Sequence, residues 1–183
     1  MLLEKYKKEV IPEMMKKFGY KSLLACPKIE KVIINCGFGR LVSEKTPEEQ
    51  RKISEAILND LAQITAQRPI LTLAKKSISS FKIRKGQPIG SKVTLRGKMM
   101  YDFLERLVQI ALPRSRDFLG IEQGAIDKEG NLTLGIREQI SFPEISPEKV
   151  KQIFGLEITV VTNAKRRDES LELFKLLGFP IKE

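Results

Sequence analysis

The side chains that most often perform catalysis are scarce in this sequence of 183 residues. There is no histidine, which excludes Ser-His-Asp triads, imidazole general bases and histidine metal sites. Cys26 and Cys36 supply too few ligands for a zinc site, and we expect both to be reduced and buried. Glu48 and Glu49 are the most obvious carboxylate pair, but they fall in the first turn of an expected helix, where they complement the helix dipole. We therefore predict that the chain is not an enzyme and uses no metal or cofactor.

Two glycine-containing segments approach phosphate-binding motifs without completing them. Gly37-Phe38-Gly39 begins like a dinucleotide fingerprint, but Val42 stands where the third glycine is required. Residues 86–92 resemble a P-loop, but their glycine spacing is one residue short and Pro88 removes a backbone N–H. We expect tight turns at both places.

The strongest chemical signal is the distribution of charge. The net charge is +10 at pH 7, and residues 61–101 contain no Asp or Glu at all. The nine basic residues of this stretch are Arg68, Lys75, Lys76, Lys82, Arg84, Lys85, Lys92, Arg96 and Lys98. Such a concentration predicts attraction to a polyanion. A nucleic acid is the favoured partner, and an anionic membrane surface or simple solubility are the alternatives.

An alternating strand crosses this basic stretch. In residues 89–96, a mostly apolar set alternates with Gly90, Lys92, Thr94 and Arg96. We predict that the second set faces outward, with two cations flanking a hydroxyl group. Such side chains suit phosphate oxygens and 2′-hydroxyl groups better than base edges. Because no aromatic residue alternates along this face, folded RNA recognised by its shape is favoured over single strands stacked on a platform.

Periodicity and turn signals predict the elements that would position these residues. Strands are expected at 28–36, 69–74, 89–96, 132–136 and 156–162. Helices are expected at 2–18 with a kink or break at Pro12, from the Thr46 cap to 64, at 98–112 ended by Pro113, briefly from 146, and at 168–177. Thr46, Pro47 and Glu49 form a capping box, and residues 113–130 are expected to be a loop.

These elements predict an α+β fold, with a largely antiparallel sheet, helices packed on one face and an open face that binds RNA. No linker divides the chain, so we expect one domain over residues 1–183. Within it, 61–101 would be the RNA-facing segment and 132–183 a C-terminal α/β portion. No stretch approaches the ~20 apolar residues of a membrane span, so we expect a soluble protein without membrane contact.

Several motifs carry a family resemblance over nearly the whole length. The most specific are QRPI at 67–70 and AKKSISSFKIRKGQPIGSKVTLRG at 74–97. Others follow in order as FGYKSL (18–23), PKIEKVIINCGFG (27–39), IALPRSRDFLG (110–120), LGIREQISFPEI (134–145) and the final LGFPIKE. Together they resemble the bacterial large-subunit ribosomal protein five family, which binds 5S rRNA. The chain departs from the family pattern at Leu119 and at 125–131, which affects only the expected contacts of 113–131.

The resemblance implies a structural constituent of the large ribosomal subunit that binds 5S rRNA in the central protuberance. The family's motifs assign that contact to Asn35, Gln67 and Thr94, and the strand periodicity adds Lys92 and Arg96. The basic loop 75–88 would reach peptidyl-site tRNA, and we expect it to be mobile in the free protein. Its tRNA-facing cations would be Lys75, Lys76, Lys82, Arg84 and Lys85.

The resemblance implies further partners in the ribosome. The segment near 134–145 would face a small-subunit ribosomal protein across an inter-subunit bridge. Large-subunit rRNA and the other 5S rRNA-binding ribosomal proteins complete the expected partners. The expected location is the ribosome of the cytoplasm, with an organellar ribosome left open.

Two rival functions come from other classes. An enzyme acting on RNA is disfavoured by the absence of histidine and of clustered carboxylates. A membrane-surface protein would need a basic amphipathic helix, whereas the cations here fall on expected strands and loops.

Overall fold

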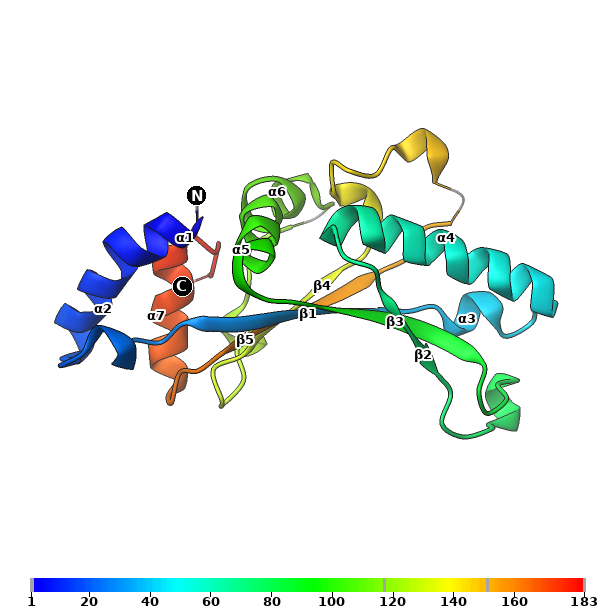
Figure 1. Ribbon diagram of the computed structural model, residues 1–183, viewed down its shortest axis with the longest axis horizontal. Coiled ribbons are helices and arrows are strands. Elements are labelled where there is room, and N and C mark those ends of the chain that lie inside the picture. The colour runs from blue at the N-terminus through cyan, green and yellow to red at the C-terminus, as the bar shows by residue number, and fades with distance from the viewer. Residues whose placement is uncertain (1, 117, 151, 183) are drawn as a thin grey trace.

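The centre of the molecule is a five-stranded sheet in which every neighbouring pair of strands is antiparallel (Figure 1). The computed structural model describes residues 2–116, 118–150 and 152–182. The strands are β1 (Ile29–Gly37), β2 (Ile70–Leu73), β3 (Pro88–Leu95), β4 (Leu132–Ile136) and β5 (Leu156–Thr162). Their order in the sheet is β2-β3-β1-β5-β4. The expected strands agree with these bounds to within one residue, and the α+β class is confirmed.

Helices are α1 (Leu2–Lys5), α2 (Ile11–Phe18), α3 (Gly39–Val42), α4 (Pro47–Thr65), α5 (Gly97–Arg106), α6 (Leu112–Arg114) and α7 (Arg167–Leu177). Short 3₁₀ turns lie at Leu23–Ala25, Ser79–Phe81, Gln123–Ala125, Gln139–Ser141 and Pro147–Lys149. Figure 1 shows α4, α5 and α6 on the same side of the sheet, where α4 contacts β3 and α5 contacts β1. The N-terminal helices and α7 pack together at one end of the molecule.

Two helices contain a π-helical turn shortly before a proline. These turns are Tyr6–Val10, followed by Pro12, and Leu107–Ala111, followed by Pro113. A proline in a helix donates no hydrogen bond and crowds the carbonyl four residues earlier, and the wider turn relieves both problems. At Pro12, where a kink or a break was expected, the helix does not break, because a π-helical turn precedes the proline and the helix runs on to Phe18. The prediction that Pro113 ends its helix is wrong, because the helix continues to Arg114.

The capping box of α4 is present as expected. The Thr46 hydroxyl accepts from the Glu49 backbone N–H at 3.4 Å, and the Glu49 carboxylate accepts from the Thr46 N–H at 3.0 Å. The hydrogen bonds that the Glu49 carboxylate accepts from the Thr46 N–H and from the Thr46 hydroxyl lower the pKa of Glu49. Helix α3 was not expected, because residues 37–39 carried only a turn signal.

One continuous cluster of buried apolar side chains extends from Leu2 to Phe179. The final helix ends at Gly178, as expected, in the left-handed conformation with φ of 93°. Beyond it, Ile181 bridges to Ile121 and thereby ties the end of the chain to the 113–130 segment. Asp117 and Glu183 of the recognised motifs lie outside the described residues. Within the described ranges, no helix is long and apolar enough to cross a membrane.

Candidate nucleic-acid interface

The two faces of the sheet differ sharply in burial. On β1, Val32 and Ile34 are fully buried under the helices, whereas Lys31, Ile33 and Asn35 point the other way and are half-buried. The same alternation holds on β3, β4 and β5. We call the uncovered side the open face. Its members on the three central strands are Lys31, Ile33 and Asn35 of β1, Lys92 and Thr94 of β3, and Glu157, Thr159 and Val161 of β5.

The strand register brings three of the expected RNA contacts together on the open face. Asn35 of β1 lies directly opposite Lys92 of β3, and Thr94 lies opposite Ile33 on the next outward-facing pair. Lys92 is exposed, and Asn35 and Thr94 are half-buried. Periodicity alone identified Lys92 and Thr94, while Asn35 came from the family resemblance. The antiparallel pairing of β1 with β3 makes them neighbours.

Gln67 also reaches this group, from the connection between α4 and β2. Its side-chain amide donates a hydrogen bond of 3.3 Å to the backbone carbonyl of Thr94. The buried Thr65 hydroxyl lies 2.7 Å from the Leu61 carbonyl and 2.9 Å from the Gln67 carbonyl, and Ala66 is left-handed with φ of 52°. This turn holds Gln67 against the end of β3. The Gln67 amide therefore has a structural partner within the chain.

Arg96 lies just past the end of β3. It is exposed and extended, and it serves as the first residue before α5 without a side-chain cap. It continues the outward set of Lys92 and Thr94 beyond the last paired residue, Leu95. All five expected contacts thus lie at the β3–β1 side of the open face.

Charge on the open face is divided between its two halves. The β3–β1 half carries Lys31, Lys92 and Arg96, whereas Glu157 of β5 lies opposite Asn35 on the other side. Farther out, the Thr159 and Thr133 hydroxyls lie 3.2 Å apart. Lys31 was missed in the sequence, although it belongs to the same alternation as Asn35. A polyanion is attracted to the β3–β1 half.

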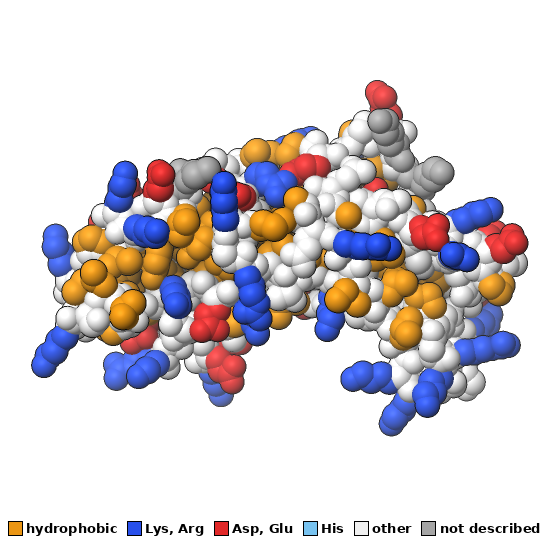
Figure 2. All heavy atoms as spheres, viewed as in Figure 1, with side chains coloured by type: hydrophobic (Ala, Val, Ile, Leu, Met, Phe, Trp, Pro, Cys, Tyr) orange, Lys and Arg blue, Asp and Glu red, His pale blue; other side chains and the backbone are white. Residues whose placement is uncertain are grey.

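The 75–88 loop connects β2 to β3 and extends beyond the sheet as a hairpin. Figure 2 shows Lys and Arg side chains gathered on this protrusion, at the lower right of the view. Within the described chain, no hydrogen bond or ion pair engages the side chains of Lys75, Lys76, Arg84 or Lys85. The expected tRNA-facing cations are therefore separate from the open-face group.

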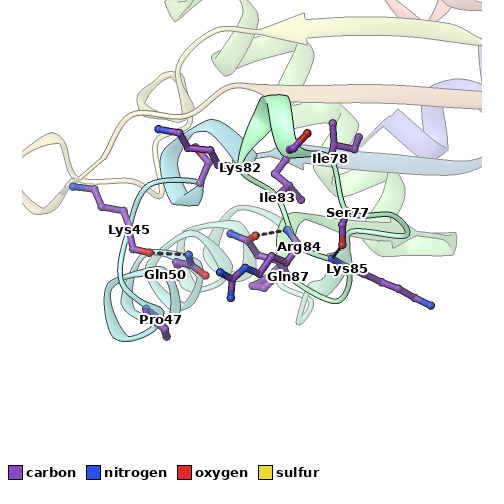
Figure 3. Close-up of a pocket in the computed structure, with 13 residues that line it drawn as sticks. Lys45, Pro47, Gln50, Ser77, Ile78, Lys82, Ile83, Arg84, Lys85 and Gln87 are labelled. Atoms are coloured by element: carbon purple, nitrogen blue, oxygen red, sulfur yellow. Dashed lines mark hydrogen bonds between the residues drawn. The ribbon is translucent and has the colours of Figure 1, made fainter.

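The hairpin is closed by its own hydrogen bonds (Figure 3). Ile78 and Ile83 form a bridge, with N···O distances of 2.9 and 3.2 Å. The Lys85 N–H donates to the Ser77 hydroxyl at 2.9 Å, and the Arg84 N–H donates to the Gln87 side chain at 3.1 Å. These bonds define one conformation, and the expected mobility of the free loop stays a prediction.

One ion pair links the hairpin to the body of the protein. The Lys82 ammonium lies 2.8 Å from a carboxylate oxygen of Glu44, which follows α3. The hydrogen bond and the charge of Glu44 raise the pKa of Lys82, and Lys82 lowers the pKa of Glu44 in the same way. Between the hairpin and the α3–α4 connection lies a hollow of about 940 Å³, lined by Lys45, Gln50, Arg84 and Lys85 among others (Figure 3).

The glycine-containing segments form no phosphate cradle. Residues 37–39 lead into α3, and Gly86 is a turn residue with φ of 85°. Gly90 lies inside β3, where a Cβ atom would approach the Thr72 hydroxyl to 2.7 Å and the Cys36 carbonyl to 2.8 Å. Its role is therefore the close approach of neighbouring strands.

Comparison with known protein families covers nearly all of the chain. Residues 23–84 match the family model described as ribosomal protein L5, and residues 88–181 match the model for the C-terminus of the same ribosomal family. The boundary between the two matches falls in the 75–88 loop.

Bacterial relatives match at close to full length. The chain is 49% identical to the large ribosomal subunit protein uL5 of Halothermothrix orenii, over 100% of this chain and 99% of the relative. It is 51% identical to uL5 of Caldanaerobacter subterraneus, over 98% and 97% of the two chains. It is 48% identical to uL5 of Chloroflexus aurantiacus, over 100% and 98%. Because these matches cover nearly the whole chain, the chain belongs to the ribosomal protein L5 family of the large ribosomal subunit.

Proposed function

We propose that this large-subunit ribosomal protein binds 5S rRNA in the central protuberance through the β3–β1 half of its open face. The observation that carries the proposal is the register that sets Asn35 against Lys92, with Thr94 on the next outward-facing pair. Family membership also confirms that the chain is a ribosomal constituent and not an enzyme.

The chemistry of the open face suits folded RNA. Lys31, Lys92 and Arg96 can neutralise phosphates, and Thr94 and Asn35 offer short polar groups to sugars and phosphates. The described open face carries no aromatic ring, so base stacking contributes nothing there. A broad, shallow RNA surface fits this composition better than an extended single strand.

The test compares the 5S rRNA affinities of alanine variants at polar residues of the same sheet. Thr94→Ala and Asn35→Ala should each weaken binding to 5S rRNA by about 0.5–1.5 kcal/mol, the net contribution of one hydrogen bond. Thr133→Ala is the matched control, because Thr133 lies on the outer strand β4 and its hydroxyl contacts Thr159. A gel-shift titration checks the affinities, and thermal melts check the fold. Equal affinities for all variants and the wild type would refute the assigned contact.

We further propose that the 75–88 hairpin contacts peptidyl-site tRNA. Support comes from four cations without a described side-chain partner on a protrusion well beyond the open face (Figure 2). Replacing Lys75, Lys76 and Lys85 with Gln should reduce tRNA retention on assembled ribosomes. Affinity of the isolated chain for 5S rRNA should show only a general electrostatic loss. Loss of 5S rRNA binding with normal tRNA retention would reverse the assignment.

A third contact is proposed for the segment after β4, which faces a small-subunit ribosomal protein. Buried Gln139 holds this segment, because its side chain donates to the Gln152 carbonyl at 2.7 Å and accepts from the Phe154 N–H at 2.9 Å. Exposed Arg137 and Pro143 lie in this segment. Replacing both with Ala should lower the fraction of associated subunits in sedimentation. An unchanged fraction would contradict the bridge.

A further inference from the structure

Phe81 differs from every other aromatic residue of the protein in its exposure. The chain has nine phenylalanines, three tyrosines and no tryptophan. Phe81 is 65% exposed, and the other eleven rings are buried or half-buried. It lies at the tip of the 75–88 hairpin, inside the acid-free stretch. An exposed ring in such a basic setting calls for a ligand that is both anionic and aromatic.

The fold holds this ring in place. Phe81 ends the 3₁₀ turn Ser79–Phe81, and the N–H of left-handed Lys82 donates to the Ser79 carbonyl at 3.0 Å. The Ile78–Ile83 bridge closes the turn beneath it, and the Lys82–Glu44 ion pair ties it to the body. In this conformation the ring does not fold back into the hairpin and stays open to solvent.

A second wall faces the ring across a hollow of about 590 Å³ between the hairpin tip and α3. Phe81 and Ile83 line one side, and Arg40 and Leu41 of α3 line the other. Glu44 also lines it, but its carboxylate is paired with Lys82. Arg40 is exposed, and no hydrogen bond or ion pair is described for its guanidinium group. The volume of this hollow is within the range of small-molecule sites.

We propose that this hollow is a nucleobase site, in which an unpaired or helix-terminal base of RNA stacks on Phe81 while Arg40 meets a neighbouring phosphate. Every base has a π face, so stacking on a single ring is tolerant of sequence. A guanidinium group matches the oxygens of a phosphate in a fork geometry. An apolar peptide is a poorer occupant, because Lys82, Arg84 and Lys85 surround the tip and the nearest carboxylate is already paired.

This site deepens the proposed contact of the hairpin with tRNA and rests on it. The sequence predicted no stacking platform along the 89–96 face, and the proposed base site lies elsewhere, at the hairpin tip.

The first test uses fluorescence, because Phe81→Trp introduces the sole tryptophan of the chain. The full-length variant is titrated with three RNAs, which are tRNA, an RNA stem-loop with unpaired loop bases, and the same stem as a closed duplex with nucleotide-free linkers at both ends. We expect tRNA and the stem-loop to quench the indole fluorescence by stacking. The capped duplex, which offers no free base, should leave the fluorescence unchanged. Equal quenching by all three RNAs, or none, would overturn the site.

The second test uses large subunits assembled with full-length variants, and it measures tRNA retention. Phe81→Leu keeps apolar bulk without a π system and should weaken retention about 5- to 150-fold, the effect of losing one stacked base. Phe81→Trp should retain tRNA as well as the wild type. Unfolding free energy and 5S rRNA affinity should not change, because the ring is exposed.

The variant Lys75→Gln/Lys76→Gln/Lys85→Gln separates the two proposals. If it loses tRNA while Phe81→Leu retains it normally, the nucleobase site is refuted and the hairpin contact stands. If neither variant affects tRNA retention, the proposed hairpin contact is refuted, and the nucleobase site that rests on it is refuted as well. Loss of tRNA by the triple variant and by Phe81→Leu, with normal retention by Phe81→Trp, supports both the hairpin contact and the nucleobase site.

Discussion

Removing one open-face cation, in Lys92→Gln, tests the proposed RNA contact quantitatively. Lys92 is exposed, belongs to no ion pair in the described structure, and lies between Asn35 on β1 and Ile70 on β2. Its removal costs no buried contact, so the fold should be unaffected. The change therefore isolates one phosphate contact.

The magnitude follows from counterion release. The β3–β1 half carries three cations, Lys31, Lys92 and Arg96. Each neutralised phosphate contributes about −0.7 to −0.9 to the slope of log K against log salt, so three give about −2.1 to −2.7 and two give about −1.4 to −1.8. Between 50 and 200 mM salt, affinity should fall roughly 20- to 40-fold for the wild type and roughly 7- to 12-fold for Lys92→Gln.

The assay is a filter-binding titration of 5S rRNA at four salt concentrations between those limits. Lys7→Gln serves as the charge-matched control, because Lys7 is exposed on the N-terminal helix at the far end of the molecule (Figure 1). Its slope should equal that of the wild type. An unchanged slope for Lys92→Gln, or an equal decrease in both variants, would refute the assignment of phosphate contacts to this half of the sheet.

Three further predictions concern stability and reactivity. Thr46→Ala should lower the free energy of unfolding by about 1 kcal/mol in urea titrations, because the cap of α4 is lost. Burial raises the pKa of both the Cys26 and Cys36 thiols, that of Cys36 to about 12, so thiolate is scarce at pH 8. Alkylation of these two thiols should be fast only after the chain is unfolded in urea. Fast alkylation in the native chain would contradict the burial of the cysteines. Gly90→Ala should cost about 1–3 kcal/mol by overpacking, whereas Gly124→Ala, with open space at its Cβ, should cost much less in the same urea titrations.

Local patterns in the sequence predicted most of the secondary structure. Each strand has a clean alternation or a β-branched run, and the capping box marks the start of α4 to the residue. Helix α3 was missed because its four residues are too few to show a helical period. The π-helical turns were missed because proline signals a disturbance without specifying whether the helix bends, ends or widens.

The sequence could predict which residues of one strand share the candidate interface, but it could not predict which strands come together there. Lys92 and Thr94 follow from the alternation of β3, since a period of two within one strand fixes which residues share a face. Asn35 and Lys31 lie on β1, more than fifty residues away, and share that face only through the register of an antiparallel pair. The exposure of Phe81 could not be predicted either, because it depends on a turn that the Ile78–Ile83 bridge closes.

The apolar residues of the open face bear on what binds there. Ile70 is 66% exposed and lies opposite Lys92, and Ile33 lies opposite Thr94. Counterion release accounts only for the part of the affinity that salt removes. The ribose edges of an RNA backbone can cover such side chains, and that contribution persists at high salt. In the proposed contact, the two isoleucines beside the cations would therefore add affinity that salt does not remove.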